Sequence, residues 1–272
     1  MTTLTHAEQD RGAPKRLALV TGASSGIGQA FARRLCAEGY DLIVVGRRRE
    51  RLDELVAEFP GRKIRPVVAD FSTHAGMEAV ADLCRKEPIS MLVNNAGVAH
   101  YMPFTQLPPE KLSELLHVKV VAPILLARAV GPGMQARRDG TIINVAGMLA
   151  FGASAPLGKA PGRAVYVAAL ATLVAFSQAL HEELSAYGLN VQALCPGVVA
   201  TEFHTRQGMD LSAIPRMSAD DVVTASLSAL AQGEAVCAPG VEQAGLLDAA
   251  FNADLAAFNA QAPHLAQRYL GS

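Results

Sequence analysis

Cysteine is scarce in this chain of 272 residues, and its four cysteines are far apart. None of them forms a CxxC pair; they are Cys36, Cys84, Cys195 and Cys237. Structural zinc sites and disulfide frameworks usually place cysteines in close, paired spacing. The spacing therefore argues against both, and it favours reduced thiols in a cytoplasmic protein. We expect no metal site.

The chain also lacks an excess of charge of either sign. Its 24 Lys and Arg residues against 25 Asp and Glu residues give a formal net charge of −1. Proteins that bind nucleic acid or anionic membranes by electrostatic attraction carry a basic excess. We therefore expect neither nucleic acid nor a membrane as a partner.

An apolar run is missing from the N-terminus, where a signal peptide would need one. Residues 1–14 are polar, and we expect them to form a disordered tail. Residues 164–180 carry no charge, but Thr172, Ser177 and Gln178 interrupt this stretch. A membrane span needs about 20 predominantly apolar residues. We interpret the stretch as a core or interface helix and expect a soluble, cytoplasmic protein.

Hydrophobic residues are abundant: they make up half of the chain, and only 18% of the residues are charged. Short apolar runs alternate with amphipathic segments such as 28–39 and 49–59. The runs have continuous apolar cores, as expected for strands covered on both faces. They are residues 16–22, 41–46, 63–70, 90–97, 140–147, 190–197 and 234–239. This alternation predicts an α/β fold with a Rossmann-type, doubly wound parallel sheet in three α/β/α layers.

No internal repeat and no Gly/Ser/Pro linker divides the chain. We therefore predict a single domain over residues 15–272, with a helical C-terminal extension. The segment FGASAPLGKAPGR (151–163) is rich in small residues, glycine and proline. Because it lies between a predicted strand and the helix of Tyr166, we interpret it as an active-site loop.

Three glycines join the first predicted strand to a helix in the segment TGASSGIG (21–28). They are Gly22, Gly26 and Gly28. Glycine permits the tight turn and lets backbone amides approach a pyrophosphate, and the helix N-terminus adds a positive dipole end. The strand before and the helix after supply the context that a dinucleotide site requires.

With these motifs the sequence resembles the short-chain dehydrogenase/reductase (SDR) family in its classical form. TGASSGIG matches the phosphate loop of the family, and NNAG (94–97) matches its second hallmark. VVAD (67–70) and CPGVVAT (195–201) also match, so the resemblance covers about residues 15 to 240. It implies an oxidoreductase that binds a nicotinamide cofactor.

The resemblance also implies which residues contact this cofactor. The phosphates would lie against Gly22, Ser24, Ser25, Gly26, Ile27 and Gly28. The adenosine side would lie near Asp70, Phe71, Asn94, Ala96 and Gly97. The nicotinamide end would lie near Tyr166, Pro196, Gly197, Val199 and Thr201.

Arginines follow the second predicted strand, which ends in VVGRRRER. In such folds an acidic residue at this place accepts the ribose 2′-hydroxyl, whereas arginine accommodates a 2′-phosphate. No carboxylate precedes Glu50. A solvated basic helix start is the alternative, but basic side chains are not favoured at a helix N-terminus. We predict NADP(H), with Arg47 and Arg48 as the contacts of the 2′-phosphate.

The family reduces carbonyls with four residues: a tyrosine as acid/base, a lysine that lowers its pKa, a serine that holds the substrate oxygen and an asparagine that orders a water. The resemblance assigns the tyrosine to Tyr166, although a buried aromatic without catalytic work is the alternative. It assigns the lysine position to Leu170, the serine position to Gly147 and the asparagine position to Lys119. Three of the four positions would therefore be changed.

One combination suggests a replacement, because a cation is missing at Leu170 and present at Lys119. We hypothesise that Lys119 reaches into the pocket and either tunes Tyr166 or acts itself as acid/base. The alternative is a surface lysine whose stem packs along apolar neighbours. Lys159 is the rival donor, and Ser154 in the same loop could supply the lost hydroxyl.

The sequence thus predicts an NADP(H)-dependent oxidoreductase that acts on an activated C=O, C=N or C=C bond. The substrate would be a hydrophobic small molecule, since apolar residues surround the expected pocket. These are His100, Tyr101, Met102, Phe104, Met148, Leu149 and Phe151. A redox-neutral cyclase, isomerase or dehydratase and a non-catalytic NADP(H)-binding pseudoenzyme or sensor remain open. The uncharged 164–180 helix also predicts a homodimer or homotetramer.

Overall fold

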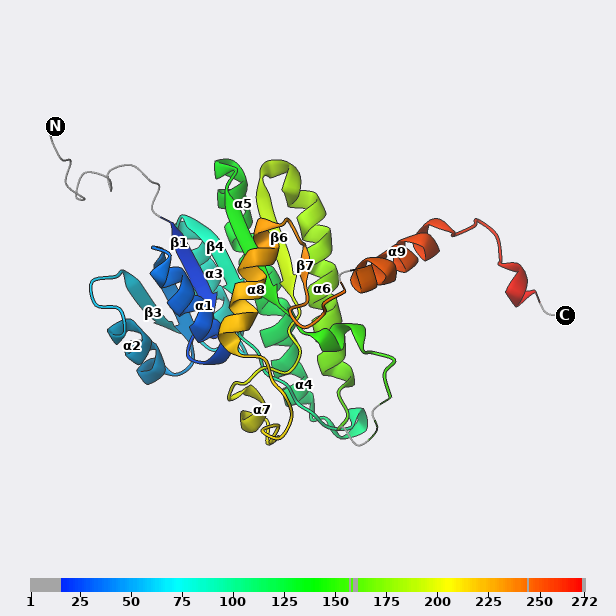
Figure 1. Cartoon of the computed structure of the whole chain (residues 1–272), viewed down its shortest axis with the longest axis horizontal. Helices are drawn as coiled ribbons and strands as arrows, with labels where there is room; N and C mark the ends of the chain where they lie inside the picture. The colour runs from blue at the N-terminus through cyan, green and yellow to red at the C-terminus, as the bar shows by residue number, and fades with distance from the viewer. Residues whose placement is uncertain (1–15, 157, 159–160, 244, 271–272) are drawn as a thin grey trace. The chain divides into compact units, whose positions relative to one another are not determined.

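Seven parallel strands form one sheet in the computed structural model, which describes residues 16–156, 158, 161–243 and 245–270. The predicted tail 1–14 lies outside the described residues. The strands are β1 (Leu17–Thr21), β2 (Asp41–Gly46), β3 (Ile64–Val68), β4 (Ile89–Asn94), β5 (Gly140–Val145), β6 (Leu189–Leu194) and β7 (Val236–Cys237). Their order is β3-β2-β1-β4-β5-β6-β7, so the predicted doubly wound fold is confirmed (Figure 1).

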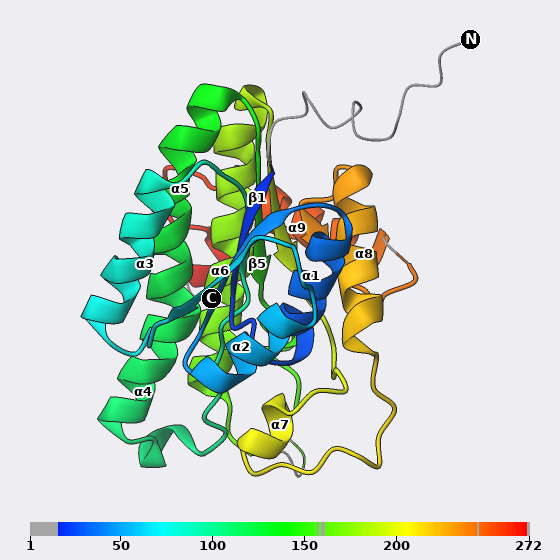
Figure 2. The ribbon, with the colours of Figure 1, turned by 90° about the vertical axis from the view of Figure 1, so that its left-hand side faces the viewer.

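Helices cover both faces of the sheet (Figure 2). One face carries α1 (Gly26–Ala37), α2 (Arg49–Ala57) and α8 (Ala219–Ala231). The other carries α3 (His74–Lys86), α4 (Pro109–Leu116), α5 (Ala122–Arg137) and α6 (Ala164–Leu184). The short helices are η1 (Phe104–Gln106), η2 (His117–Val121), η3 (Met148–Phe151), η4 (Ser185–Tyr187) and α7 (Phe203–Arg206).

The strands and helices form where the local sequence favours them. The cores of β1 and β2 are unbroken apolar runs, and their side chains are buried because helices cover both faces. Strand β3 contains Arg65 and is only partly buried. Two helices begin at a side-chain cap: the Thr73 hydroxyl accepts from the Gly76 amide, and the Ser218 hydroxyl accepts from the Asp221 amide. The last predicted strand is shorter than expected and keeps only Val236 and Cys237.

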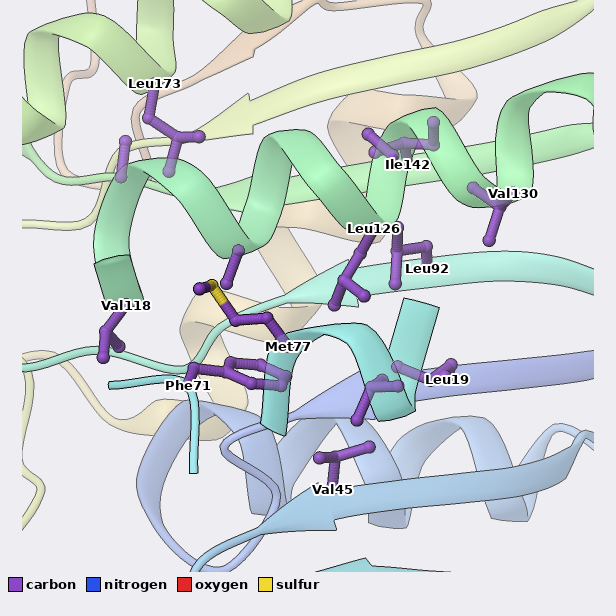
Figure 3. Packing of buried hydrophobic residues seen from close by; sticks show 14 of the residues in the cluster. Leu19, Val45, Phe71, Met77, Leu92, Val118, Leu126, Val130, Ile142 and Leu173 are labelled. Atoms are coloured by element: carbon purple, nitrogen blue, oxygen red, sulfur yellow. The ribbon is translucent and has the colours of Figure 1, made fainter. Parts of the chain in front are cut away.

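The main core lies between the sheet and the layer of α3, α5 and α6. Figure 3 shows Leu92 of β4 and Leu126 of α5 pointing toward each other, with Phe71 beside Met77 of α3. Full burial of such a side chain stabilises a fold by about 1.5–3 kcal/mol. A second cluster, centred on Phe31 and Leu35 of α1, fills the opposite face. The two clusters fix the sheet between its helix layers.

The strand order places a switch point beside β1. Strand β1 pairs with β2 on one side and with β4 on the other; Leu19 is in register with both Ile43 and Leu92. The connections after β1 and β4 therefore run to opposite faces of the sheet. This divergence opens a crevice at the carboxyl ends of the strands, where ligands bind in open α/β sheets.

Two stretches of the described residues, 109–137 and 164–187, are long and apolar enough to cross a membrane by length and composition alone. Core helices of soluble proteins meet the same criterion. In this fold, helices of both stretches line the sheet and contribute buried side chains such as Leu126 and Leu173. Their apolar composition is thus partly explained by packing.

Among the described residues, those up to Pro239 form one compact unit and those from Gly240 onward form a second. The second unit contains α9 (Gly245–Asn259) and the short helix η5 (Gln267–Tyr269). Its side chains are largely exposed, including the large apolar ones at Leu246, Leu255 and Phe258.

Candidate active site

A pocket of about 420 Å³ lies at the carboxyl ends of the central strands. Segments that follow β1, β2, β3, β4, β5 and β6 line it, together with residues of η2 and α6. Most of the predicted cofactor contacts are among its lining residues: Gly22, Ser24, Ser25, Gly26, Ile27, Arg47, Arg48, Asp70, Phe71, Ala96, Gly97, Tyr166, Pro196, Gly197, Val199 and Thr201. The motifs quoted from the sequence therefore meet in one place.

The glycine-rich loop after β1 has no room for a side chain at Gly22 or Gly26. Gly22 and Gly26 have φ values of +65° and +55°, a conformation that favours glycine. A Cβ at Gly22 would lie 2.8 Å from Asn95 Nδ2, and one at Gly26 would lie 2.9 Å from Thr201 Cγ2. Helix α1 begins at Gly26, so its positive N-terminal end faces the pocket. The loop has the shape and polarity that a dinucleotide pyrophosphate requires.

Gly28 serves a different purpose from its two neighbours. It does not line the pocket, and a Cβ there would lie 2.4 Å from the carbonyl oxygen of Gly22. The missing side chain lets the first turn of α1 approach the loop. Gly28 therefore shapes the site through the backbone.

The loops after β1 and β4 are joined by hydrogen bonds. The Thr21 hydroxyl accepts from the amides of Asn95 at 2.9 Å and Ala96 at 3.0 Å. The Asn95 side-chain amide in turn donates to the carbonyl oxygens of Thr21 and Gly22. The NNAG segment thus holds the phosphate loop in place through these hydrogen bonds. Sequence analysis missed Asn95, although the motif that contains it was recognised.

The structure differs from the expectation at Asn94, which does not line the pocket. Its side chain is buried and donates to Asn144 Oδ1 at 2.9 Å and to the Pro123 carbonyl oxygen at 3.2 Å. Asn94 is the last residue of β4, and Asn95 belongs to the segment that follows the strand. Asn94 therefore links β4 to β5 and α5, while Asn95 reaches the pocket.

The two arginines after β2 line the pocket, and Arg48 has the denser contacts. Its Nη2 donates to the hydroxyls of Ser24 and Ser25 at 3.1 and 3.0 Å, and to Glu202 Oε1 at 2.6 Å. Arg47 Nη1 lies 3.6 Å from Glu114 Oε1. The hydrogen bond from Arg48 lowers the pKa of the Glu202 carboxyl below its usual value. This pocket edge therefore carries a carboxylate that sequence analysis missed.

Lys119 is buried in the pocket, and it lies in η2, a turn of π-helix between α4 and α5. Its Nζ donates to the Val145 carbonyl oxygen at 2.8 Å. A Cβ at Gly97 would lie 3.3 Å from Lys119 Cδ, so the stem runs directly beside that glycine. Burial lowers the pKa of the Lys119 ammonium to about 8. Such a group exchanges its proton close to neutral pH.

Tyr166 lies in the first turn of α6 and is buried in the same pocket. Its ring meets Tyr101 edge to face with centroids 5.4 Å apart, and it stacks on Phe203 at 6.4 Å. Burial raises the pKa of the Tyr166 phenol well above its ordinary value, and the neighbouring Tyr101 raises it further. The phenol is therefore a neutral hydrogen-bond donor. One turn on, Leu170 is 1% exposed and also lines the pocket.

The remaining predicted residues have different fates. Ser154 is exposed and does not line the pocket, and Lys159 lies outside the described residues. Of the expected apolar lining, Tyr101, Met148 and Leu149 line the pocket. His100, Met102, Phe104 and Phe151 are not among the lining residues. Within the described part of the chain, no three His, Cys, Asp or Glu residues group as a metal site.

A profile of the family described as short chain dehydrogenase matches residues 16–211 of this chain. Among curated proteins, the chain is 34% identical over 194 residues to the human "Inactive hydroxysteroid dehydrogenase-like protein 1". That match covers 68% of this chain and 56% of the relative. The chain thus spans little more than half the length of the first curated relatives that it matches.

Two solved structures resemble the whole fold. A short-chain dehydrogenase from Sphingobium yanoikuyae in complex with NADPH has a TM-score of 0.87 and 33% identity, covering 93% of this chain and 100% of that one. A "bulky-bulky ketone specific alcohol dehydrogenase" from Comamonas testosteroni has a TM-score of 0.85 and 28% identity. That match covers 95% of this chain and 100% of the other.

Proposed function

Because the chain belongs to the short-chain dehydrogenase/reductase family, a family of NAD(P)-dependent oxidoreductases, we propose that it uses NADP(H) to reduce a hydrophobic small molecule. The reacting bond is an activated C=O, C=N or C=C. The proton comes from an atypical system in which Lys119 replaces the usual lysine. The observation that carries this proposal is the buried Lys119 ammonium in the same pocket as Tyr166.

The cofactor preference rests on Arg48. Its guanidinium lies among the hydroxyls of the phosphate loop, where a 2′-phosphate would receive charge-assisted hydrogen bonds. Gly22, Gly26 and the start of α1 would hold the pyrophosphate. The Sphingobium relative, which binds NADPH, supports the same choice. When bound, the nicotinamide ring would supply the hydride.

The proposed proton donor follows from the pKa values of Tyr166 and Lys119. Leu170 brings no cation to Tyr166, and burial holds the pKa of this phenol high. Tyr166 therefore acts as a hydrogen-bond donor and is a poor source of protons. The pKa of about 8 at Lys119 makes its ammonium the better acid near neutral pH. Lys119 accordingly gives the proton, and Tyr166 orients the substrate.

The substrate class rests on the lining of the pocket beyond the cofactor motifs. Tyr101, Met148, Leu149 and Phe203 provide apolar and aromatic surface there. Pockets of this composition bind hydrophobic small molecules, with a few polar groups setting orientation. The Comamonas relative is described as specific for bulky ketones, which supports a bulky apolar substrate here. An activated C=O, C=N or C=C bond is reduced with less help from a general acid, so it suits a site without the usual lysine.

The test is the consumption of NADPH by the full chain with a panel of ketones, enones and imines. We expect turnover with at least one class. Removal of the buried ammonium in Lys119→Ala should lower kcat by at least tenfold, and Tyr166→Phe should also lower it. The control Lys111→Ala removes an exposed lysine of α4 and should leave kcat unchanged. Full activity of Lys119→Ala would overturn the proposed proton system.

A second candidate is a binding protein that holds NADP(H) without turnover. The resemblance assigns the lysine and serine positions of the family to Leu170 and Gly147, and one human relative is described as inactive. Tight NADPH binding without turnover of any compound in the panel would favour this candidate. A redox-neutral reaction would instead consume substrate without changing the NADPH absorbance.

A further inference from the structure

We propose that the hydroxyls of Tyr101 and Tyr166 together bind the oxygen of a carbonyl substrate. This inference rests on the proposed function, and it narrows the reacting bond to a C=O group. Tyr101 takes the part that a serine at the Gly147 position would otherwise play. Nothing in the motifs of the sequence points to Tyr101 in this role.

The two phenols come from different elements and meet inside the pocket. Tyr101 belongs to the segment between β4 and α4, whereas Tyr166 lies in the first turn of α6. Their rings are 5.4 Å apart at an interplanar angle of 66°, and their hydroxyls are joined by a hydrogen bond. Both residues line the pocket. The pair therefore brings two hydroxyls to one point: the Tyr101 O–H is free for a substrate oxygen, and the Tyr166 O–H would turn from Tyr101 to that oxygen when the substrate binds.

Two neutral hydroxyls suit a carbonyl oxygen. Such an oxygen has two lone pairs and accepts two hydrogen bonds, whereas an imine nitrogen accepts one. Burial raises the pKa of both phenols, so both keep their protons at neutral pH. Donors held in place in a poorly solvated pocket stabilise the negative charge that develops on oxygen during reduction. The pair is thus suited to the transition state of carbonyl reduction.

Gly147 lines the same pocket as Tyr166 and leaves space for a side chain that the chain does not have. Gly147 has an extended backbone, with φ at 161°, so any residue could adopt its conformation. A Cβ there would lie 3.5 Å from Leu170 Cδ1 and 3.6 Å from the Pro196 carbonyl oxygen, which are ordinary contacts. A serine would therefore fit. Because Gly147 has no hydroxyl and the Tyr101 ring contacts Tyr166, we assign the second donor to Tyr101.

The reduction conserves atoms and electrons when the cofactor supplies the hydride and Lys119 supplies the proton. The carbonyl carbon accepts the hydride, and the C=O π electrons move to oxygen. The two phenols hydrogen-bond to this oxygen while it takes a proton from the Lys119 ammonium. The products are the alcohol, the oxidised nicotinamide and a neutral Lys119 amine, which regains its proton from water.

The test uses the full chain, NADPH and an aryl ketone such as benzophenone. Tyr101→Phe keeps the ring and removes one donor, so kcat should fall by about 100-fold or more. The affinity for NADPH should not change. Adding Gly147→Ser to that variant should raise its kcat again by at least tenfold. The control Tyr187→Phe changes a tyrosine outside the pocket and should have no effect.

Two outcomes would overturn the inference: a kcat of Tyr101→Phe within twofold of the starting protein, or no rescue by Gly147→Ser. Binding of the ketone to the complex with NADP⁺ separates this inference from the proposed function, because no hydride can be transferred there. Ketone binding that weakens at least fivefold in Tyr101→Phe supports the hydroxyl pair even without turnover. Equal binding in both proteins, or none in either, contradicts it.

Discussion

The guanidinium of Arg48 is held 2.6 Å from the Glu202 carboxylate, although the two residues are 154 positions apart. The same Nη2 atom contacts the hydroxyls of Ser24 and Ser25 in the phosphate loop. The arginine that we assign to the 2′-phosphate of the cofactor thus already has an anionic partner. If the 2′-phosphate binds Arg48 as we propose, it competes there with the Glu202 carboxylate.

Replacement of Arg48 by alanine should weaken NADPH binding and leave NADH binding nearly unchanged. Hydrogen bonds to charged groups contribute about 1.5–3 kcal/mol, so the loss should be roughly 10- to 100-fold. Calorimetric titration with both cofactors measures it. Arg51→Ala is the matched control, since Arg51 pairs with Glu54 on the exposed side of α2. An equal loss for NADPH and NADH would contradict the assignment.

Glu202→Gln should have the opposite effect. The substitution removes the anion that competes for Arg48, so we expect NADPH affinity to rise by about three- to tenfold, since charged partners strengthen hydrogen bonds roughly twofold. NADH affinity should stay constant. The hydrogen bond from Arg48 lowers the pKa of the Glu202 carboxyl, so the carboxylate is charged at neutral pH and the gain should be present there. A fall in NADPH affinity would mean that Glu202 helps to hold the cofactor.

The glycines of the phosphate loop should respond differently to alanine. Gly26→Ala meets Thr201 and a positive φ, so cofactor affinity should fall and the fold should lose about 1–2 kcal/mol. Gly28→Ala meets backbone atoms of Gly22 and should destabilise the fold more. Gly240→Ala, with nothing within 4 Å, should stay within about 0.5 kcal/mol. Chemical denaturation and NADPH titration distinguish these outcomes.

The buried ammonium of Lys119 should reduce the stability of the fold at neutral pH. Its pKa is lowered from 10.5 to about 8, so between these values the unfolded chain binds more protons and stability rises with pH. At pH 7 the penalty is about 3 kcal/mol. Replacing Lys119 by methionine would remove this penalty, but it would also remove the hydrogen bond to the Val145 carbonyl oxygen, which costs about 1 kcal/mol.

We therefore expect Lys119→Met to be more stable than the starting protein at pH 7 by about 1–2 kcal/mol. The difference should disappear near pH 10, where the folded starting protein carries a neutral amine. Urea denaturation at both pH values measures it. A difference that does not change with pH would show that the proton equilibrium of Lys119 does not contribute.

The sheet and the phosphate loop could be predicted because their signals are local. The apolar run of β2 (Asp41–Gly46) matches its predicted range, and the glycine spacing carries its own geometric reason. The side-chain direction at the end of β4 could not be read as easily. The resemblance singled out Asn94, whereas the turn that follows the strand brings Asn95 to the pocket.

The partners inside the pocket could not be predicted, because they depend on the paths of long connections. Tyr101 lies in the segment between β4 and α4, which has no periodic pattern, and the path of this segment brings Tyr101 to Tyr166. Glu202 meets Arg48 only after the chain has crossed most of the sheet. Ser154 was expected as a substitute hydroxyl, but its loop leaves it exposed. Such contacts become visible only when the whole fold is known.

The role of Lys119 as proton source is tested most directly by the pH dependence of NADPH-driven ketone reduction. The account predicts that kcat/KM is flat below about pH 8 and falls tenfold per pH unit above it, because the ammonium loses its proton. Lys119→Met should lower kcat/KM by about 10²-fold or more and remove this decline. An unchanged rate and profile in Lys119→Met would contradict the account.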